Sequence, residues 1–286
     1  MIAGPPVFHL AGVMGWPVMH SRSPLIHNHW FEQHGLAGRY VPLAIEPAGL
    51  AAALRALPAL RFAGCNLTLP HKERALEWVD EVDAAARQIG AVNCVQVRAD
   101  GSLLGCNTDA EGFVRNLRQQ QPGWRADAGP AVVVGAGGGA RAVCFGLLAE
   151  GVREVRVVNR TLARAQEVGA ALGAVAVHAV PWTERAQALA DAALVVNTTS
   201  LGMEGQAPLD LPLQHLPASA VVSDIVYVPL ITPLLAAARD RGNPVVTGLG
   251  MLLHQAVPAW KRWFGIEPEV TPALQALVEA TLQPKA

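Results

Sequence analysis

Residues 131–141, AVVVGAGGGAR, and residues 155–161, VRVVNRT, carry the clearest chemical signal in this chain. Each contains a run rich in β-branched residues that predicts a strand. Between the two runs, a glycine-rich turn leads into an Ala/Leu-rich helical stretch. This order is typical of a dinucleotide-binding unit, in which glycines let a pyrophosphate approach the N–H groups of a helix start. The pattern predicts a dinucleotide cofactor, and a purely structural glycine turn is the alternative.

The end of the second predicted strand indicates which dinucleotide binds. An acidic residue there would bond the ribose 2′-hydroxyl of NAD, but this chain has Asn159 and Arg160. Arginine is the residue that a 2′-phosphate requires, and Thr161 and Arg164 extend the anion site. We therefore predict NADP as the cofactor of a redox enzyme. The alternative for Arg160 is an ordinary surface arginine.

A second set of polar residues could hold an acidic substrate. Ser21 and Ser23 lie where a predicted strand ends and a helix begins. Hydroxyl groups there, together with the free N–H groups of the helix start, favour a carboxylate. A plain helix cap at Ser23 is the alternative. Asn66 and Thr68 fall on one face of another predicted strand because side chains alternate along a strand.

Lys72 and Asp109 are the candidates for proton transfer. Lys72 follows a predicted strand end, where α/β sheets bind their ligands, and Asp109 begins a predicted helix. A lysine and an aspartate at the ends of neighbouring elements could form a proton-transfer pair. A solvated lysine and a helix cap within Asn107–Asp109 are the alternatives.

The histidines do not predict a metal site. Positions 27 and 29 point in different directions on a helix, and no acidic residue or cysteine near positions 20 to 34 completes a set of ligands. The four cysteines lack metal-binding spacing, and we predict free thiols in a reducing cytoplasm at positions 65, 94, 106 and 144.

The elements that position these groups follow an α/β pattern. Strands are predicted over 8–14, 39–45, 62–69, 192–197 and 220–226, besides the two described above. Helices are predicted over 23–35, 47–57, 71–79 and 109–120, and mostly helical sequence runs from 247 to 286. Residues 92–106 predict a hairpin, and Pro122-Gly123 marks a boundary after the connecting helix.

We predict two α/β domains from this order of elements. Residues 1–108 form a substrate-binding domain, and residues 109–246 form a Rossmann-like NADP-binding domain. The C-terminal helices, 247–286, are predicted to pack back on the first domain. The 51% of hydrophobic residues suits strands that are buried on both faces.

Charge and hydropathy exclude several classes of partner. The net charge is -1 without a basic run, which argues against nucleic acid and anionic membranes. The N-terminal stretch MIAGPPVFHLAGVMGW has no Lys or Arg before its apolar part and does not predict a signal peptide. Residues 218–238 are apolar, but Asp224, Pro229 and Pro233 interrupt them, so we predict a strand, loop and helix.

The motifs, in this order, resemble the shikimate dehydrogenase family over essentially the whole chain. The matching pieces are GWPVMHSRSP (15–24), NLTLPHK (66–72), GAVN (90–93), GCNTD (105–109), GAGGGARA (135–142), NRT (159–161), NTTSLGM (197–203), DIVYVP (224–229) and GLGMLLHQA (248–256). The resemblance implies reversible reduction of 3-dehydroshikimate to shikimate by NADPH, in the chorismate pathway to aromatic amino acids. Separately from the resemblance, we expect a cytoplasmic enzyme that is a monomer or homodimer and holds no metal.

The resemblance also implies roles for individual residues. Ser21 and Ser23 would hold the substrate carboxylate, with Tyr227 near it, and Lys72 and Asp109 would be the catalytic pair that also contacts the substrate. The residues implied to bond ring hydroxyls are Asn66, Thr68, Asn93, Asp109 and Gln255. Those implied to contact NADP are Gly135, Ala136, Gly137, Gly138, Gly139, Asn159, Arg160, Thr161, Arg164, Thr198, Thr199, Ser200, Ile225, Gly248 and Met251.

Three positions depart from the family's commonest pattern. Cys94 stands where threonine is usual, Gly139 where alanine is common, and Trp16 where a smaller polar residue is usual. Trp16 is expected at the rim of the site, so the range of substrates that the protein accepts does not follow from the resemblance.

Two rival functions remain at this point. One is a quinate/shikimate dehydrogenase with relaxed cofactor use, from which Arg160 and Ser23 point away. The other is a regulator without catalytic activity that binds NADP or a metabolite on the same fold. The intact Lys72 and Asp109 weigh against the second.

Overall fold

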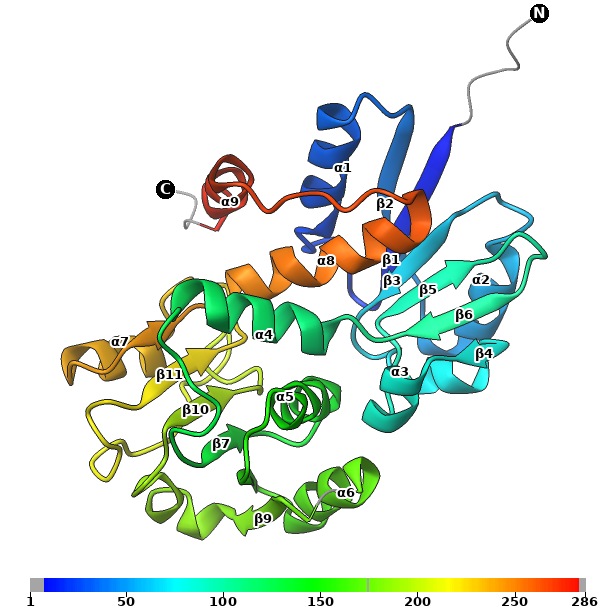
Figure 1. Cartoon of the computed structure of the whole chain (residues 1–286). Coiled ribbons are helices and arrows are strands. Elements are labelled where there is room, and N and C mark those ends of the chain that lie inside the picture. Colours follow the sequence, from blue (N-terminus) through cyan, green and yellow to red (C-terminus); the bar gives the residue numbers. More distant parts are fainter. Residues whose placement is uncertain (1–7, 174, 283–286) are drawn as a thin grey trace, which may run out of the picture. The chain divides into compact units, whose positions relative to one another are not determined.

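The computed structural model describes residues 8–173 and 175–282 (Figure 1). The chain divides into two compact units, each built around its own sheet. Of the described residues, unit 1 contains 8–108 and Ala256–Val278, and unit 2 contains 109–173, 175–255 and 279–282. The predicted α/β class with two α/β parts is confirmed. The chain returns to unit 1 inside one helix, α8 (Leu249–Phe264), later than the predicted residue 247.

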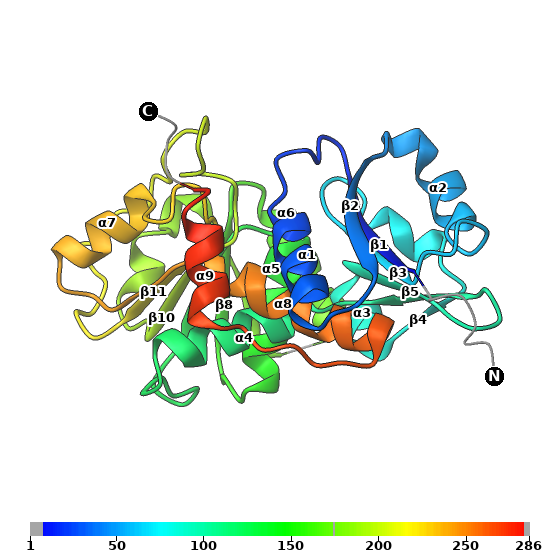
Figure 2. The ribbon, with the colours of Figure 1, turned by 90° about the horizontal axis from the view of Figure 1, so that it is seen from above.

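The sheet of unit 1 is mixed. Its strands lie in the order β2 (Gly38–Ala44), β1 (His9–Gly15), β3 (Gly64–Leu67), β5 (Cys94–Val97), β6 (Leu103–Cys106) and β4 (Glu81–Val82). β1, β2 and β3 are parallel, whereas β5 runs antiparallel to both β3 and β6 and confirms the predicted hairpin. The helices of this unit are α1 (Ser23–Gln33), α2 (Leu50–Ala56), α3 (Ala84–Ile89) and the second half of α8. α1 lies alongside β2 (Figure 2). Another helix, α9 (Pro272–Glu279), follows α8 in the chain.

The helix predicted over 71–79 is wrong. The structure has only a short 3-10 helix at Arg74–Glu77. Asp80 explains the difference, because its N–H donates to the Leu103 carbonyl (2.9 Å) and its carboxylate accepts the Leu103 N–H (2.8 Å). These two bonds draw the chain into β4 at the sheet edge, and pairing with a distant strand outweighs the local helical pattern.

Aromatic side chains attach the second half of α8 to the rest of unit 1. The Trp260 ring packs against Phe31 and Phe264, with centroid distances of 4.6 Å to each. Trp263 donates from its ring N–H to the Val95 carbonyl (3.0 Å). It lies so close to Gly64 of β3 that a Cβ there would overlap the indole ring. The helix therefore lies directly on the sheet that carries the predicted substrate-binding residues.

The sheet of unit 2 is entirely parallel. Its strands lie in the order β12 (Val245–Val246), β11 (Val221–Asp224), β10 (Leu194–Asn197), β7 (Ala131–Val134), β8 (Val155–Asn159) and β9 (Val177–Pro181). This is the doubly wound order of dinucleotide-binding folds, with the reversal between β7 and β10. The helices are α4 (Asp109–Gln120), α5 (Gly138–Ala149), α6 (Leu162–Leu172), α7 (Pro233–Asp240) and the first half of α8.

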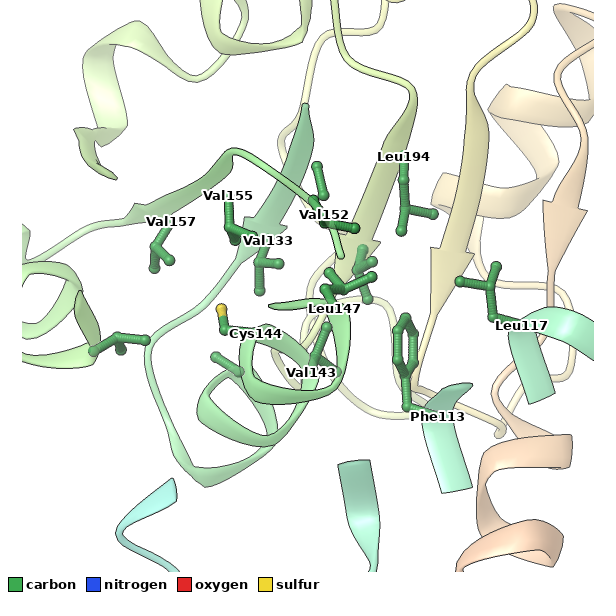
Figure 3. Close-up of a cluster of buried hydrophobic side chains, with 14 of the residues drawn as sticks. Phe113, Leu117, Val133, Val143, Cys144, Leu147, Val152, Val155, Val157 and Leu194 are labelled. Atoms are coloured by element: carbon green, nitrogen blue, oxygen red, sulfur yellow. The ribbon is translucent and has the colours of Figure 1, made fainter. Parts of the chain in front are cut away.

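The core of unit 2 joins helices to sheet. α4 and α5 lie side by side (Figure 1). Phe113 of α4, Val143 of α5 and Val133 of β7 are almost fully buried in one cluster (Figure 3). A fully buried apolar side chain of this size contributes about 1.5–3 kcal/mol, so this cluster anchors α4 and α5 on the sheet.

The interrupted apolar segment forms ordinary elements. β11 and α7 lie at either end of residues 218–238 with a loop between them, which confirms the predicted strand, loop and helix. Among the helices that the structure describes, none has the length and apolar character needed to cross a membrane.

Candidate functional site

The strand ends of unit 1 bring the predicted substrate-binding residues of this unit to one edge of its sheet. β1 and β3 are parallel, so the segments that follow them leave the sheet at the same edge. Because β5 is antiparallel to β3, with Cys94 opposite Asn66, the residue before β5 lies at this edge too. That residue is Asn93. β6 also ends here, since Cys106 lies opposite Cys94.

A buried hydrogen-bond network connects three polar side chains at this edge. Asn66 donates from Nδ2 to the Asn93 carbonyl (3.1 Å). Asn93 accepts the Thr108 N–H at Oδ1 (2.7 Å) and donates from Nδ2 to the Thr108 hydroxyl (3.0 Å). All three residues are buried, and buried amides with these partners are held in one orientation. The network fixes the backbone immediately before Asp109.

Ser21 and Ser23 lie together at the start of α1. Ser23 is buried and its N–H donates to the Ser21 hydroxyl oxygen (3.3 Å). The N-cap position of α1 is Arg22, so the alternative that Ser23 is the cap is wrong. The Ser23 side chain also hydrogen-bonds with that of Tyr40. Ser21, which is only half-buried, accepts through its oxygen, a role that does not use its hydroxyl proton.

Thr68 and Lys72 follow β3. Thr68 packs where Gly15 of β1 has no side chain, since a Cβ on Gly15 would lie 2.4 Å from Thr68 Cγ2. Lys72 is half-buried, and its carbonyl accepts the Val92 N–H (2.8 Å). The Lys72 backbone is therefore tied to the residue that precedes Asn93.

In unit 2, Asp109 opens α4 and is buried. On the same helix, Gly112 lies against α8, because a Cβ there would be 2.6 Å from Gln255 Cβ and 2.8 Å from its backbone nitrogen. Gln255 is also buried. The missing side chain at Gly112 thus lets α8 hold Gln255 within one helical turn of Asp109.

Two amides of α4 hold the segment that leads into α8. Asn116 donates from Nδ2 to the Thr247 carbonyl (2.8 Å), and Gln120 donates to the same oxygen (3.1 Å). Gln120 also accepts the Thr247 N–H at Oε1 (3.0 Å). Gly250 follows so closely that a Cβ there would overlap the Asn116 amide. The helix that begins with Asp109 therefore also positions the predicted NADP-contacting segment near Gly248.

Ile225 and Gly248, two of the predicted NADP residues, are in contact with each other. A Cβ on Gly248 would lie 2.5 Å from the backbone of Ile225, so glycine is required there. The Ile225 side chain also reaches toward Gly139 of the glycine-rich turn, 3.2 Å from the position of a Cβ. The structure brings these three predicted residues together, and Met251 lies buried three residues after Gly248.

The turn after β7 fits a pyrophosphate. Gly135 has a φ of 113°, which favours glycine, and Thr198 donates its hydroxyl proton to the Val134 carbonyl beside it (2.7 Å). The N-cap of α5 is Gly137, and a Cβ added there would meet none of the described atoms within 4 Å. Packing does not explain this glycine, whereas room for a ligand above the helix start does.

The end of β8 places positive charge at the same edge. β8 pairs in parallel with β7, so Arg160 leaves the sheet beside the glycine-rich turn. Asn159 donates from Nδ2 to the Thr161 carbonyl (2.8 Å), and Thr161 is the N-cap of α6. Arg160, Thr161 and Arg164 are all exposed. Two guanidinium groups at an accessible helix start suit a phosphate.

Asp224 joins the loops that follow β10 and β11. It is fully buried and accepts from Asn197 Nδ2 (3.0 Å), the Val226 N–H (2.9 Å) and the Thr232 hydroxyl (2.7 Å). Burial raises the pKa of Asp224 to about 6, although the three donors lower it. Asn197 in turn accepts the Thr199 N–H and hydroxyl (3.0 and 2.8 Å). These bonds give both loops a fixed shape.

Comparison with known proteins decides which family this arrangement belongs to. Residues 13–95 match the family described as "Shikimate dehydrogenase substrate binding domain", 118–203 match "Shikimate / quinate 5-dehydrogenase", and 248–278 match "Shikimate 5'-dehydrogenase C-terminal domain". A shikimate dehydrogenase (NADP(+)) of Paramagnetospirillum magneticum is 56% identical over 269 residues, which cover 94% of this chain and 97% of that protein. The chain belongs to the shikimate dehydrogenase family.

Solved structures of the shikimate dehydrogenase family have the same fold. The shikimate 5-dehydrogenase of Thermus thermophilus in complex with NADP(H) and shikimate is 38% identical, with a TM-score of 0.86 over 96% of this chain and 100% of that chain. A quinate dehydrogenase of Corynebacterium glutamicum in complex with NAD is 34% identical, with a TM-score of 0.86 over 96% and 99%. Since both share the fold equally well, individual side chains must distinguish between these activities.

Sequence reasoning missed several residues that support the site. Asp224 had a usable signal, because it ends an apolar strand at the carboxyl edge of a parallel sheet. Tyr40 and Asn116 had none, since their partners Asn66 and Thr247 are 26 and 131 residues away. Within residues 8–173 and 175–282, no group of three or more His, Cys, Asp or Glu side chains is arranged to hold a metal ion.

Proposed function

We propose that this chain catalyses the reversible, NADPH-dependent reduction of 3-dehydroshikimate to shikimate, a step toward chorismate and the aromatic amino acids. The observation that carries this proposal is the nearly full-length similarity to relatives named shikimate dehydrogenase (NADP(+)), two of them 56% identical. The site residues agree with it, because the chain has groups suited to the carboxylate and hydroxyls of the substrate and to the phosphates of NADP.

We assign substrate binding to the polar residues that were predicted to contact the substrate. Ser21, Ser23 and the start of α1 would hold the carboxylate, with Tyr227 near it, because hydroxyl and N–H donors favour an anion. The residues that would bond ring hydroxyls are Asn66, Thr68, Asn93, Asp109 and Gln255. The buried Asn66–Asn93–Thr108 network supports this assignment, since rigid amides can discriminate between hydroxyl positions.

We assign NADP binding to unit 2. The α5 start with Gly137 would hold the pyrophosphate, and Arg160, Thr161 and Arg164 the 2′-phosphate. The nicotinamide would lie against Ile225, Gly248 and Met251. The remaining predicted contacts are Gly135, Ala136, Gly138, Gly139, Asn159, Thr198, Thr199 and Ser200. When bound, NADPH supplies the hydride that reduces the ketone carbon.

Lys72 and Asp109 would carry the proton chemistry. As the ketone is reduced, its oxygen gains negative charge and must be protonated. The Lys72 ammonium donates this proton and regains one from solvent, to which its half-buried side chain has access. The Asp109 carboxylate accepts a hydrogen bond from a ring hydroxyl, so that the reacting oxygen is oriented toward the donor. In the reverse direction, neutral Lys72 accepts the proton.

An absorbance assay for the formation of NADPH or NADH tests the proposal directly. Shikimate and quinate are each offered with NADP and with NAD, and kcat/KM is measured for all four pairs. The expected result is the highest kcat/KM for shikimate with NADP. A higher value for quinate with NAD would favour the activity named for the Corynebacterium structure. Turnover with none of the four pairs would reject the enzyme assignment.

Two finer assignments complete the proposal. We expect a cytoplasmic enzyme that acts as a monomer or homodimer. Sedimentation of the purified protein at several concentrations measures the oligomeric state, and a larger assembly would contradict this expectation.

A further inference from the structure

Tyr40 is a buried hydroxyl beside the substrate-binding residues of unit 1. It lies on β2, is almost fully buried, and donates from its hydroxyl to Asn66 Oδ1 (2.8 Å). The same hydroxyl interacts with the Ser23 side chain. One buried group therefore touches both a residue proposed to bond a ring hydroxyl and one proposed to hold the carboxylate.

The direction of these hydrogen bonds follows from counting donors. Asn66 uses its Nδ2 group to donate to the Asn93 carbonyl, so its Oδ1 faces Tyr40 and needs a donor. The single proton of the Tyr40 hydroxyl meets that need. Ser23 must then donate to the Tyr40 oxygen. If the Asn66 amide were turned over, its oxygen would face the Asn93 carbonyl, and two acceptors would oppose each other.

The His27 ring packs against one face of the Tyr40 ring. The two rings stack at 4.0 Å with an angle of 3° between them. His27 is fully buried, and burial lowers its pKa to about 3, so it stays a neutral, flat surface at any pH at which the protein is assayed. Asn28, the next residue of α1, exchanges two hydrogen bonds with the Tyr40 backbone (2.9 and 3.0 Å). The position of the hydroxyl is thus fixed through both the ring and the backbone.

We propose that Tyr40 is a positioning residue for the substrate: its hydroxyl sets the orientation of the Asn66 amide and ties it to Ser23. This inference rests on the proposed binding of a polyhydroxy acid at these residues. With Oδ1 held by Tyr40, Asn66 keeps its second Nδ2 proton for a ring hydroxyl. Tyr40 remains a donor at neutral pH, since burial raises its pKa well above the ordinary value.

Tyr40→Phe isolates the hydroxyl because it keeps the ring stacked on His27. We expect the KM for shikimate to rise about 3- to 30-fold, since a buried acceptor loses its donor, while kcat and the KM for NADP change little. A double-mutant cycle with Asn66→Ala tests the route of the effect. If Tyr40 acts through Asn66, the double variant has the same KM for shikimate as Asn66→Ala alone. If the fold increase in the KM of the double variant equalled the product of the two single-variant fold increases, the proposal would be overturned.

Trp260→Phe is the matched control. Trp260 belongs to the same aromatic cluster and lies 5.8 Å from the His27 ring. This variant should lower the thermal unfolding midpoint and leave the KM for shikimate unchanged. If it raised the KM as much as Tyr40→Phe does, general loosening of the cluster would explain the result, and positioning by the hydroxyl would be rejected.

A spectroscopic measurement keeps the inference independent of the proposed function. With selective ¹⁵N labelling of asparagine, the Asn66 side-chain amide signals are assigned from their loss in Asn66→Ala. Tyr40→Phe should shift these signals, and Trp260→Phe should not. Unshifted signals would reject the Tyr40 contact even if shikimate proved not to be a substrate. A shift without shikimate turnover would reject only the proposed function.

Discussion

Arg160→Ala should convert this enzyme from a strong to a weak preference for NADP. Arg160 directly follows β8 and is exposed beside the start of α6. Its proposed partner, the 2′-phosphate, distinguishes NADP from NAD. Removing the guanidinium should therefore affect NADP and leave NAD nearly unchanged.

The exposure of Arg160 sets the magnitude of this effect. A hydrogen bond to a charged group contributes about 1.5–3 kcal/mol, whereas fully exposed ion pairs contribute only about 0.2–1 kcal/mol. A phosphate that is partly desolvated at a helix start lies between these cases, and we expect about 1.5–2 kcal/mol. This corresponds to about 10- to 30-fold in kcat/KM for NADP. Arg164 lies on the first turn of the same helix and should retain part of the preference in the single variant.

Steady-state kinetics with shikimate and both cofactors measures the effect. Salt supplies a second readout, because screening weakens exposed charge pairs. The KM for NADP should rise with ionic strength in the wild type and rise less in Arg160→Ala. Arg153→Ala is the matched control, since Arg153 is also exposed but lies before β8, at the opposite edge of the sheet. An unchanged NADP-to-NAD ratio in Arg160→Ala, or an equal change in Arg153→Ala, would refute the reasoning.

Chemistry, anchoring and stability each give one further prediction. Lys72→Ala should lower kcat by about 10²–10⁴-fold with a smaller change in the KM for shikimate, and the double variant with Asp109→Asn should lose less than the product of the single losses. A near-wild-type kcat in folded Lys72→Ala would remove lysine from the mechanism. Ser21→Ala and Ser23→Ala should each weaken shikimate binding about 10- to 100-fold, as titration calorimetry would show, and unchanged affinity in the double variant would reject the anchoring role. Because the pKa of Asp224 is raised from 3.8 to about 6, its contribution to the free energy of unfolding is fully present below 3.8 and is lost as the pH rises through 6. Urea unfolding should show the wild type gaining about 1 kcal/mol relative to Asp224→Asn between pH 7 and pH 5, whereas equal differences at both pH values would contradict the raised pKa.

Local signals in the sequence determined the nucleotide-binding half of this protein. The strand before Gly135, the glycine-rich turn and α5 are consecutive in the chain, so their residue types alone specify them. The hairpin of β5 and β6 and the helix α4 were predicted for the same reason. The candidate site residues were found where a short motif follows a strand, and the comparisons place those motifs in the shikimate dehydrogenase family.

The tertiary structure decided what depends on partners far apart in the sequence. The helical pattern at 71–79 gave way to a short 3-10 helix because Asp80 pairs with Leu103 in the neighbouring strand. From the sequence, Tyr40 is only another residue of a predicted strand, and the fold is what brings its hydroxyl to Asn66. In the same way, Asn116 is only a polar residue of a predicted helix, and the fold is what brings the Thr247 carbonyl to it. A short stretch of sequence shows only the helix or strand propensity of residues that are neighbours along the chain. Strand pairing and buried hydrogen bonds instead join residues that become neighbours only when the apolar core closes around them, so they could not be predicted from the chain alone.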